Sequence, residues 1–233
     1  MNKEIKIYVI HYSKLKERKQ SIKSILDPLN VEYEFIEDYD KEDLANIDTN
    51  NFYIDDKSIF NEKIKLWKEK ANKYRPMTRP ELSCSIKHLE AIRKIQFGNH
   101  EFSLIIEDDV IPKNKDFLKQ IDKLLLKNKS WDVLFIGEGM GEKYRKSKLG
   151  YRRFIPFKNT LKMEHPATNC LEAYIIKKSR VNLILEGLVP INLVIDWELA
   201  YQFYKQNMNI YWSKKSIFYQ GSKHNIYKSE LRK

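Results

Sequence analysis

Short, almost continuously apolar runs recur along the chain and are separated by segments with a helical repeat. The first run is Ile5–Ile10, in which β-branched residues prevail. Ile22, Ile25 and Leu29 then recur at helical spacing, and a second run follows at Val31–Ile36. Runs of this kind are typical of strands buried on both faces of a parallel sheet. The strand–helix–strand order therefore predicts an α/β fold with a right-handed crossover.

The length of 233 residues suits one α/β domain with a well-buried core. We therefore predict a single domain over residues 1–233. Within it, residues 54–76 predict a helical insertion that carries Ile64 and Trp67 on one side. Residues 222–233 form a basic C-terminal tail.

Polar residues mark the predicted helix starts. Thr78 lies three residues before Glu81, which is the capping-box pattern, and Gly98 is expected to end the helix that begins there. Ser13 and Ser179 are the predicted N-caps of two further helices.

The helix after Thr78 has two distinct faces. Glu81, Ser85 and His88 follow one another at intervals of four and three, so their side chains share a face and could contact a ligand together. Taken alone, a histidine at the position of His88 is more often a core residue than a ligand. An adjacent apolar stripe predicts the core-facing side and consists of Leu82, Ile86, Leu89 and Ile92.

Three consecutive acids, Glu107, Asp108 and Asp109, follow the apolar strand Phe102–Ile106 directly. Ligands of open α/β sheets bind at the carboxyl ends of strands, where this cluster would lie. Adjacent carboxylates disfavour one another's ionisation unless a cation joins them, and hard oxygen ligands suit manganese or magnesium. Alternation along an extended segment would place Glu107 and Asp109 on one side and Asp108 on another. A helix-capping role for the acids is the alternative.

The formal net charge of +11 would attract an anionic partner, such as a nucleotide sugar, a phosphorylated glycolipid, a membrane surface or a nucleic acid. The alternative to an enzyme is therefore a basic protein that binds nucleic acid or an anionic surface without catalysis. No nucleic-acid-binding motif appears and the basic residues are interspersed with acids, so we expect no nucleic-acid partner. Lysines spread along helices are most often a solvated surface.

The cysteines and the hydropathy pattern bear on location. Cys84 and Cys170 match no paired metal-ligand spacing, which favours reduced, buried thiols in a reducing compartment. The N-terminus lacks the apolar core of a signal peptide, and no apolar stretch of about twenty residues occurs. We expect a cytoplasmic protein that contacts the cytoplasmic face of an anionic membrane peripherally, through the basic residues 228–233.

Ordered motifs over most of the chain resemble glycosyltransferase family 25, which includes bacterial lipopolysaccharide galactosyltransferases and animal collagen galactosyltransferases. They are IYVIHYSKLKERKQSI (7–22), ELSCSIKHLEAI (81–92), SLIIEDDVIP (103–112), ATNCLEAYIIKKS (167–179) and VIDWELA (194–200). The resemblance implies a GT-A (Rossmann-like) nucleotide-sugar transferase fold. It also implies inverting, manganese-assisted transfer of a hexose, galactose or glucose, from a UDP-sugar to an acceptor hydroxyl on a glycan or glycolipid such as lipopolysaccharide.

The resemblance also assigns roles to residues on the donor side. Glu107-Asp108-Asp109 looks like the family's acidic motif, with Glu107 and Asp109 as metal ligands and with Glu107 and Asp108 in contact with the donor. His88 looks like the histidine of the family's serine-histidine-leucine helix, although Lys87 replaces the serine. Tyr12 and Arg18 are the expected nucleotide or diphosphate contacts, His224 is the expected second metal ligand, and Asn169 is expected to bind sugar hydroxyls.

Inversion needs a base that takes the acceptor proton. Asp196 matches the family's aspartate at this place and is the predicted base, with an N-cap role as its alternative. Glu138, Glu172 and Glu198 are the other candidates. A metal-dependent phosphohydrolase could also use the acidic triplet, but a two-metal site would need a second cluster of ligands, which the sequence does not display.

Overall fold

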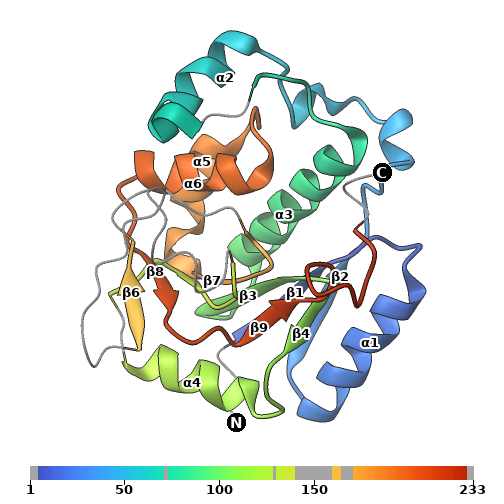
Figure 1. Ribbon diagram of the computed structural model, residues 1–233, viewed down its shortest axis with the longest axis vertical. Coiled ribbons are helices and arrows are strands. Elements are labelled where there is room, and N and C mark those ends of the chain that lie inside the picture. The colour runs from blue at the N-terminus through green and yellow to red at the C-terminus, as the bar shows by residue number, and fades with distance from the viewer. Residues whose placement is uncertain (1–4, 71–72, 128–129, 140–158, 164–169, 230–233) are drawn as a thin grey trace.

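The computed structural model describes residues 5–70, 73–127, 130–139, 159–163 and 170–229 (Figure 1). Within these ranges the strands are β1 (Ile5–Ile10), β2 (Glu32–Ile36), β3 (Phe102–Glu107), β4 (Val110–Pro112), β5 (Val133–Phe135), β6 (Thr160–Lys162), β7 (Ala173–Lys177), β8 (Ile210–Ser213) and β9 (Phe218–Gln220). The α-helices are α1 (Lys16–Leu26), α2 (Lys57–Ile64), α3 (Arg79–Phe97), α4 (Phe117–Lys127), α5 (Val181–Leu188) and α6 (Ile195–Lys205). None of the helices described is long and apolar enough to cross a membrane.

The central sheet has the strand order β2-β1-β3-β7-β5-β8-β6, and β4 pairs with β9 in a small antiparallel sheet. β1 runs parallel to both β2 and β3, which confirms the predicted strand–helix–strand unit around α1. β7 runs antiparallel to β3 and β5, so the sheet is mixed and not wholly parallel as its continuous apolar runs suggest. The predicted α/β class is confirmed.

Helices cover both faces of the central sheet (Figure 1). Alternate residues of β1 point to opposite faces, as the pleat requires. Ile7 and Val9 pack with α1 and α4 on one face, whereas Tyr8 and Ile10 pack with α3, α5 and α6 on the other. Because both faces are covered, the central strands are apolar on nearly every residue, and burial of each large side chain contributes about 1.5–3 kcal/mol.

Of the three helix N-caps that the sequence predicts, one is confirmed and two are wrong. Thr78 forms the predicted capping box at the start of α3, and Gly98 follows the last helical residue. The predictions for Ser13 and Ser179 are wrong, because neither α1 nor α5 has a side-chain cap. The Ser13 hydroxyl instead donates a hydrogen bond to the carboxylate of Asp40, a residue distant in sequence.

The insertion at residues 54–76 contains α2 and a short 3-10 helix, Lys65–Lys70. It packs against α6 through aromatic contacts, with the Trp67 and Trp197 rings 4.7 Å apart. The buried ammonium of Lys63 also lies 2.6 Å and 2.7 Å from the carboxylate oxygens of Glu198, which is fully buried on α6. The insertion is thus fixed beside the first turn of α6, where Asp196 lies.

Candidate active site

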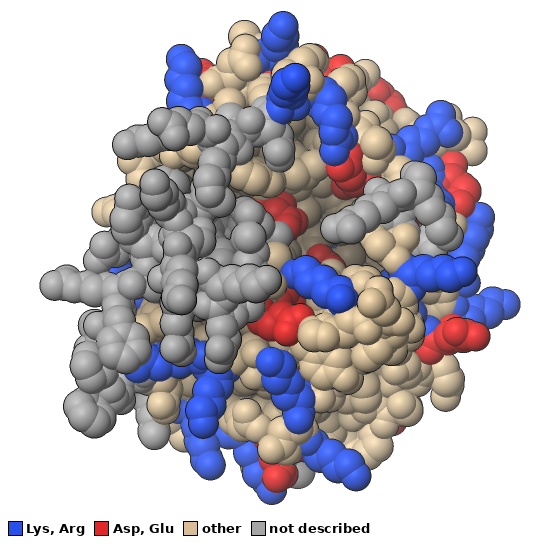
Figure 2. Space-filling model, in the orientation of Figure 1, with Lys and Arg blue, Asp and Glu red and all other residues tan. Residues whose placement is uncertain are grey.

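The acidic triplet lies where β1 and β3 end side by side. Ile10, the last residue of β1, is the register partner of Glu107, the last residue of β3. Because the two strands are parallel, the residues that follow them emerge at the same edge of the sheet. Figure 2 shows a hollow on this face, with acidic side chains inside it and Lys and Arg side chains around it.

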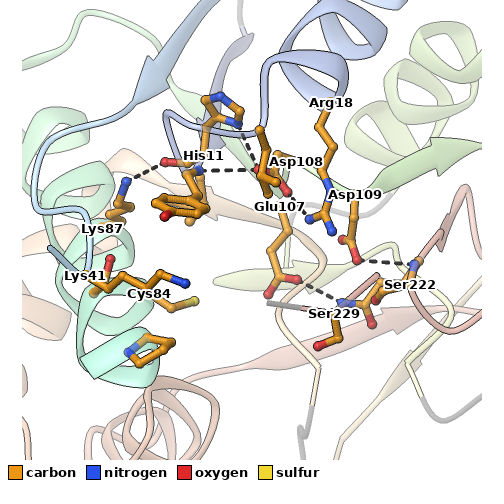
Figure 3. Close-up of a pocket in the computed structure, with 16 residues that line it drawn as sticks. His11, Arg18, Lys41, Cys84, Lys87, Glu107, Asp108, Asp109, Ser222 and Ser229 are labelled. Atoms are coloured by element: carbon orange, nitrogen blue, oxygen red, sulfur yellow. Dashed lines mark hydrogen bonds and ion pairs between the residues drawn. The ribbon is translucent and has the colours of Figure 1, made fainter. Parts of the chain in front are cut away.

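Two adjoining pockets occupy this edge. The His11 pocket includes His11, Tyr12, Arg18 and the acidic triplet (Figure 3). The Asp196 pocket includes Ser85, Glu172, Asp196 and Lys223. The side chains that line both pockets are Cys84, Glu107, Gln220, Ser222 and Ser229.

Asp108 is held by the segment that follows β1. One of its carboxylate oxygens lies 2.8 Å from Nδ1 of His11 and accepts a bond from the Tyr12 backbone, and the other accepts a 2.7 Å bond from Arg18. Its negative charge is therefore balanced from within the protein. Its partners also differ from those of Glu107 and Asp109, in agreement with the predicted alternation.

Glu107 and Asp109 have fewer partners. Glu107 accepts a 2.9 Å bond from the Gln220 side chain, and one oxygen of Asp109 accepts a long bond of 3.4 Å from the Ser222 backbone. The other oxygen of Asp109 is buried and has no hydrogen-bond partner among the described residues. Burial raises the pKa of both carboxyl groups, and the charge of Asp109 adds to the effect on the pKa of Glu107.

This carboxylate pair fits a hard divalent cation. Bringing a positive charge between Glu107 and Asp109 would remove their mutual repulsion and would give the unpaired Asp109 oxygen a partner. Carboxylate oxygens are the donors that magnesium and manganese prefer. Glu107 and Asp109 could therefore hold such an ion, and they are two of the three metal ligands that the sequence predicts, the third being His224.

His88 lies behind the pockets on α3 and is fully buried. Its Nδ1 atom lies 2.9 Å from the Tyr174 hydroxyl, and its Nε2 atom lies 3.9 Å from a carboxylate oxygen of Glu107. Burial lowers the pKa of His88 to about 4, so the imidazole is neutral near pH 7. Glu81 and Ser85, which were expected to share a ligand with it, line the Asp196 pocket, whereas His88 lines neither pocket.

Asp196 lies in the first turn of α6 and lines the Asp196 pocket. The helix is preceded by Val194, and no side chain caps it, so the alternative role of Asp196 as an N-cap does not apply. Burial raises the pKa of Asp196 to about 7, and the negative charge of Glu107 adds to this effect. A carboxylate with this pKa can take a proton near neutral pH.

Tyr12 and Arg18 both line the His11 pocket and have partners within the chain. The Tyr12 hydroxyl donates a 2.7 Å bond to Glu42, and the Lys41 ammonium lies 4.9 Å from the centre of the Tyr12 ring. Arg18 donates to Asp108 and to the backbone carbonyl of Lys228. Arg18 therefore joins the acidic triplet to the C-terminal segment.

Two of the remaining predicted site residues, His224 and Glu198, have partners other than the acidic pair. The Nε2 atom of His224 lies 2.8 Å from the Glu138 carboxylate, and its ring packs against Tyr219. Glu198 is held by Lys63, which leaves it no role as the base. Asn169 lies outside the described residues.

Several site residues were not predicted. Lys223 donates bonds to the Gly139 carbonyl and to the Cys170 sulfur, and it lines the Asp196 pocket. Lys87 is buried and donates to the backbone carbonyls of His11 and Glu37, so it links α3 to the ends of β1 and β2. Cys84 precedes His88 by four residues, a spacing that places both on one helix face and could have indicated its position.

The α/β sheet with an acidic edge matches the expected class of nucleotide-sugar transferases. The chain belongs to glycosyltransferase family 25, a family described as lipopolysaccharide biosynthesis proteins, whose model matches residues 4–199. It is thus a glycosyltransferase, as the sequence motifs predict.

Solved structures of other glycosyltransferases are similar at low identity. TarS from S. aureus in complex with UDP-GlcNAc is 15% identical, with a TM-score of 0.46, and the match covers 93% of this chain and 58% of TarS. A glycosyltransferase that acts in glycosylation of the PBCV-1 major capsid is 10% identical, with a TM-score of 0.45 and coverage of 93% and 92%. Galactosyltransferase 7 from Drosophila, in complex with manganese, UDP-Gal and xylobiose, is 10% identical, with a TM-score of 0.42 and coverage of 99% and 80%. A comparison with curated proteins gives no match.

Proposed function

We propose that this glycosyltransferase is a metal-dependent, inverting enzyme that moves a hexose, galactose or glucose, from a UDP-sugar to an acceptor hydroxyl. The acceptor would belong to a glycan or a glycolipid such as lipopolysaccharide. The observation that carries the proposal is the placement of Asp196, whose pKa is raised to about 7, in a pocket that shares Glu107 with the acidic edge of the sheet. The proposed base would thus adjoin the proposed site of a diphosphate-binding cation.

On the donor side, we assign the nucleotide to the His11 pocket. Tyr12 offers an aromatic ring for a base, and Lys41 adds positive charge near the phosphates. Glu107 and Asp109 would hold a manganese or magnesium ion, which stabilises the negative charge of the diphosphate leaving group. Asp108 would act through Arg18 and His11 to fix this wall of the pocket.

On the acceptor side, Asp196 would accept the proton of the attacking hydroxyl in the Asp196 pocket. Attack from the side opposite the leaving group inverts the anomeric carbon. Glu172 also lines this pocket, but it accepts a bond from the Gly139 backbone, so Asp196 is the better placed base. Asn169 would bind sugar hydroxyls, and His224 would supply a second metal ligand on release from Glu138.

The acceptor class bears on location. A glycolipid acceptor would bring the enzyme to the cytoplasmic face of a membrane, where the basic residues 228–233 would contact anionic lipids. Removal of residues 230–233, which spares the Arg18 contact, should weaken binding to anionic vesicles. Unchanged vesicle binding would contradict this part of the proposal.

The test is calorimetric titration of UDP and a panel of UDP-sugars, with and without manganese. We expect binding that requires the metal and that is lost in Asp109→Asn. Asp196→Asn should bind the donor normally but should not transfer the sugar, and Asp116→Asn, at an exposed position, is the matched control. Absence of nucleotide binding under every condition would refute the proposal and would favour a non-catalytic, anion-binding protein.

A further inference from the structure

We propose that Cys84, His88 and Glu107 form a binding site for a thiophilic divalent cation, with zinc as the best match. This site would be distinct from the hard-cation pair Glu107 and Asp109, although both would use Glu107. Cys84 and Glu107 enter the same pocket from α3 and from the end of β3 (Figure 3).

The three donor groups already lie close to a metal-binding arrangement. Cys84 and His88 are four residues apart on α3, so they share one face of the helix. One ligand atom from each of the three side chains lies within 4.8 Å of the others. Zinc bond lengths place the ligand atoms of a tetrahedral site roughly 3.3–3.6 Å apart. A nitrogen and an oxygen ligand of such an ion lie roughly 3.3 Å apart, so the distance of 3.9 Å between His88 Nε2 and Glu107 would have to shorten by about 0.6 Å on binding.

The state of the His88 ring is an independent indication of a ligand. Its Nε2 atom is buried and has no hydrogen-bond partner among the described residues. An unpaired polar atom in the protein interior costs about 1–3 kcal/mol, so a partner is expected. The Tyr174 hydroxyl lies 2.9 Å from Nδ1 and can accept its proton, which leaves the Nε2 lone pair free for a metal.

The chemistry of the donors selects the metal. Thiolate and imidazole ligands favour zinc over magnesium and manganese, which prefer oxygen. Three protein ligands leave a fourth position of a tetrahedral ion open, as in zinc sites that accept a further small ligand. Because Cys84 and Glu107 line both pockets, that open position would lie at the junction of the His11 and Asp196 pockets.

Because both proposed cation sites use Glu107, zinc binding is expected to affect sugar transfer. Zinc bound to Glu107 would make this carboxylate unavailable to the hard cation. It would also occupy the junction of the His11 and Asp196 pockets, between the proposed donor and acceptor sites. We therefore expect zinc to inhibit sugar transfer in competition with manganese. This consequence rests on the proposed function, whereas the binding of zinc does not.

Cobalt is a suitable spectroscopic probe for zinc at this site. We expect the cobalt-loaded protein to have a sulfur-to-metal charge-transfer band that zinc abolishes by displacement. The band should be lost in Cys84→Ser, and His88→Gln should weaken cobalt affinity by about tenfold or more. Cys170→Ser is the matched control, because Cys170 is the second of the two cysteines and also lines the Asp196 pocket. Absence of the band in the native protein, or its persistence in Cys84→Ser, would overturn the inference.

A second measurement does not depend on removing Cys84. In the Cys170→Ser variant Cys84 is the remaining thiol, and zinc should slow its alkylation by about tenfold or more, whereas magnesium should not. An alkylation rate that zinc leaves unchanged would contradict the inference. Thiol protection by zinc without any binding of UDP-sugars would instead refute the proposed function and leave the zinc site standing.

Discussion

Lowering the pH from about 8 to about 6 is expected to slow sugar transfer about tenfold, because Asp196 must be ionised to accept a proton. With a pKa of about 7, its ionised fraction falls from roughly nine-tenths to roughly one-tenth over this range. An ordinary aspartate, whose pKa is near 3.8, would stay ionised throughout and the rate would not change. The magnitude therefore follows chiefly from the burial of this one carboxyl group, which is the largest cause of its raised pKa.

The assay is the pH dependence of kcat/KM for release of UDP, at saturating manganese so that Glu107 and Asp109 stay ionised. Lys223 lowers the pKa of Asp196, so Lys223→Met should move the midpoint of the profile to higher pH, whereas Lys223→Arg should leave it nearly unchanged. A flat profile between about pH 6 and pH 8 in the native enzyme would refute the assignment of Asp196 as the base.

Two further predictions concern groups around the site. Glu198→Gln should lower the free energy of urea unfolding by about 3–5 kcal/mol, because Lys63 would keep a buried charge without a partner. Glu186→Gln, at an exposed position on α5, should change it by less than about 0.5 kcal/mol, and an equal effect of both would contradict the reasoning. Tyr174→Phe should weaken zinc binding about 10–100-fold, because His88 would lose the partner that orients its ring. Titration of UDP into the same variant should give an unchanged affinity, and a parallel loss would indicate damage to the whole site.

Local patterns in the sequence predicted the features that depend on neighbouring residues. The capping box at Thr78 is correct because both of its partners lie within one helical turn, and the apolar run of β1 is correct because burial on both faces of the sheet makes nearly every residue of the strand apolar. Ser13 was mispredicted because a distant carboxylate, Asp40, takes its hydroxyl hydrogen bond. The contact between His224 and Glu138 joins residues 86 positions apart, which no local pattern can reveal.

The same limit applies to the candidate site. The acidic triplet was found because three carboxylates after a buried strand are electrostatically unusual wherever they occur. The position of Cys84 at the junction of two pockets was not found, since a buried thiol is most often an ordinary core residue. The raised pKa of Asp196 depends on burial and on Glu107, and both follow only from the fold.

The contact between Arg18 and the Lys228 carbonyl spans 210 positions of the chain. One wall of the His11 pocket therefore comes from the beginning of the fold and another from the segment after β9. Contacts of such sequence separation form late, because the intervening chain must first be ordered. During synthesis, β1, α3 and the acidic triplet would leave the ribosome well before residues 218–229. A nascent chain would then hold an open, incomplete pocket, and the proposed nucleotide binding would require residues 218–229 to have folded into place.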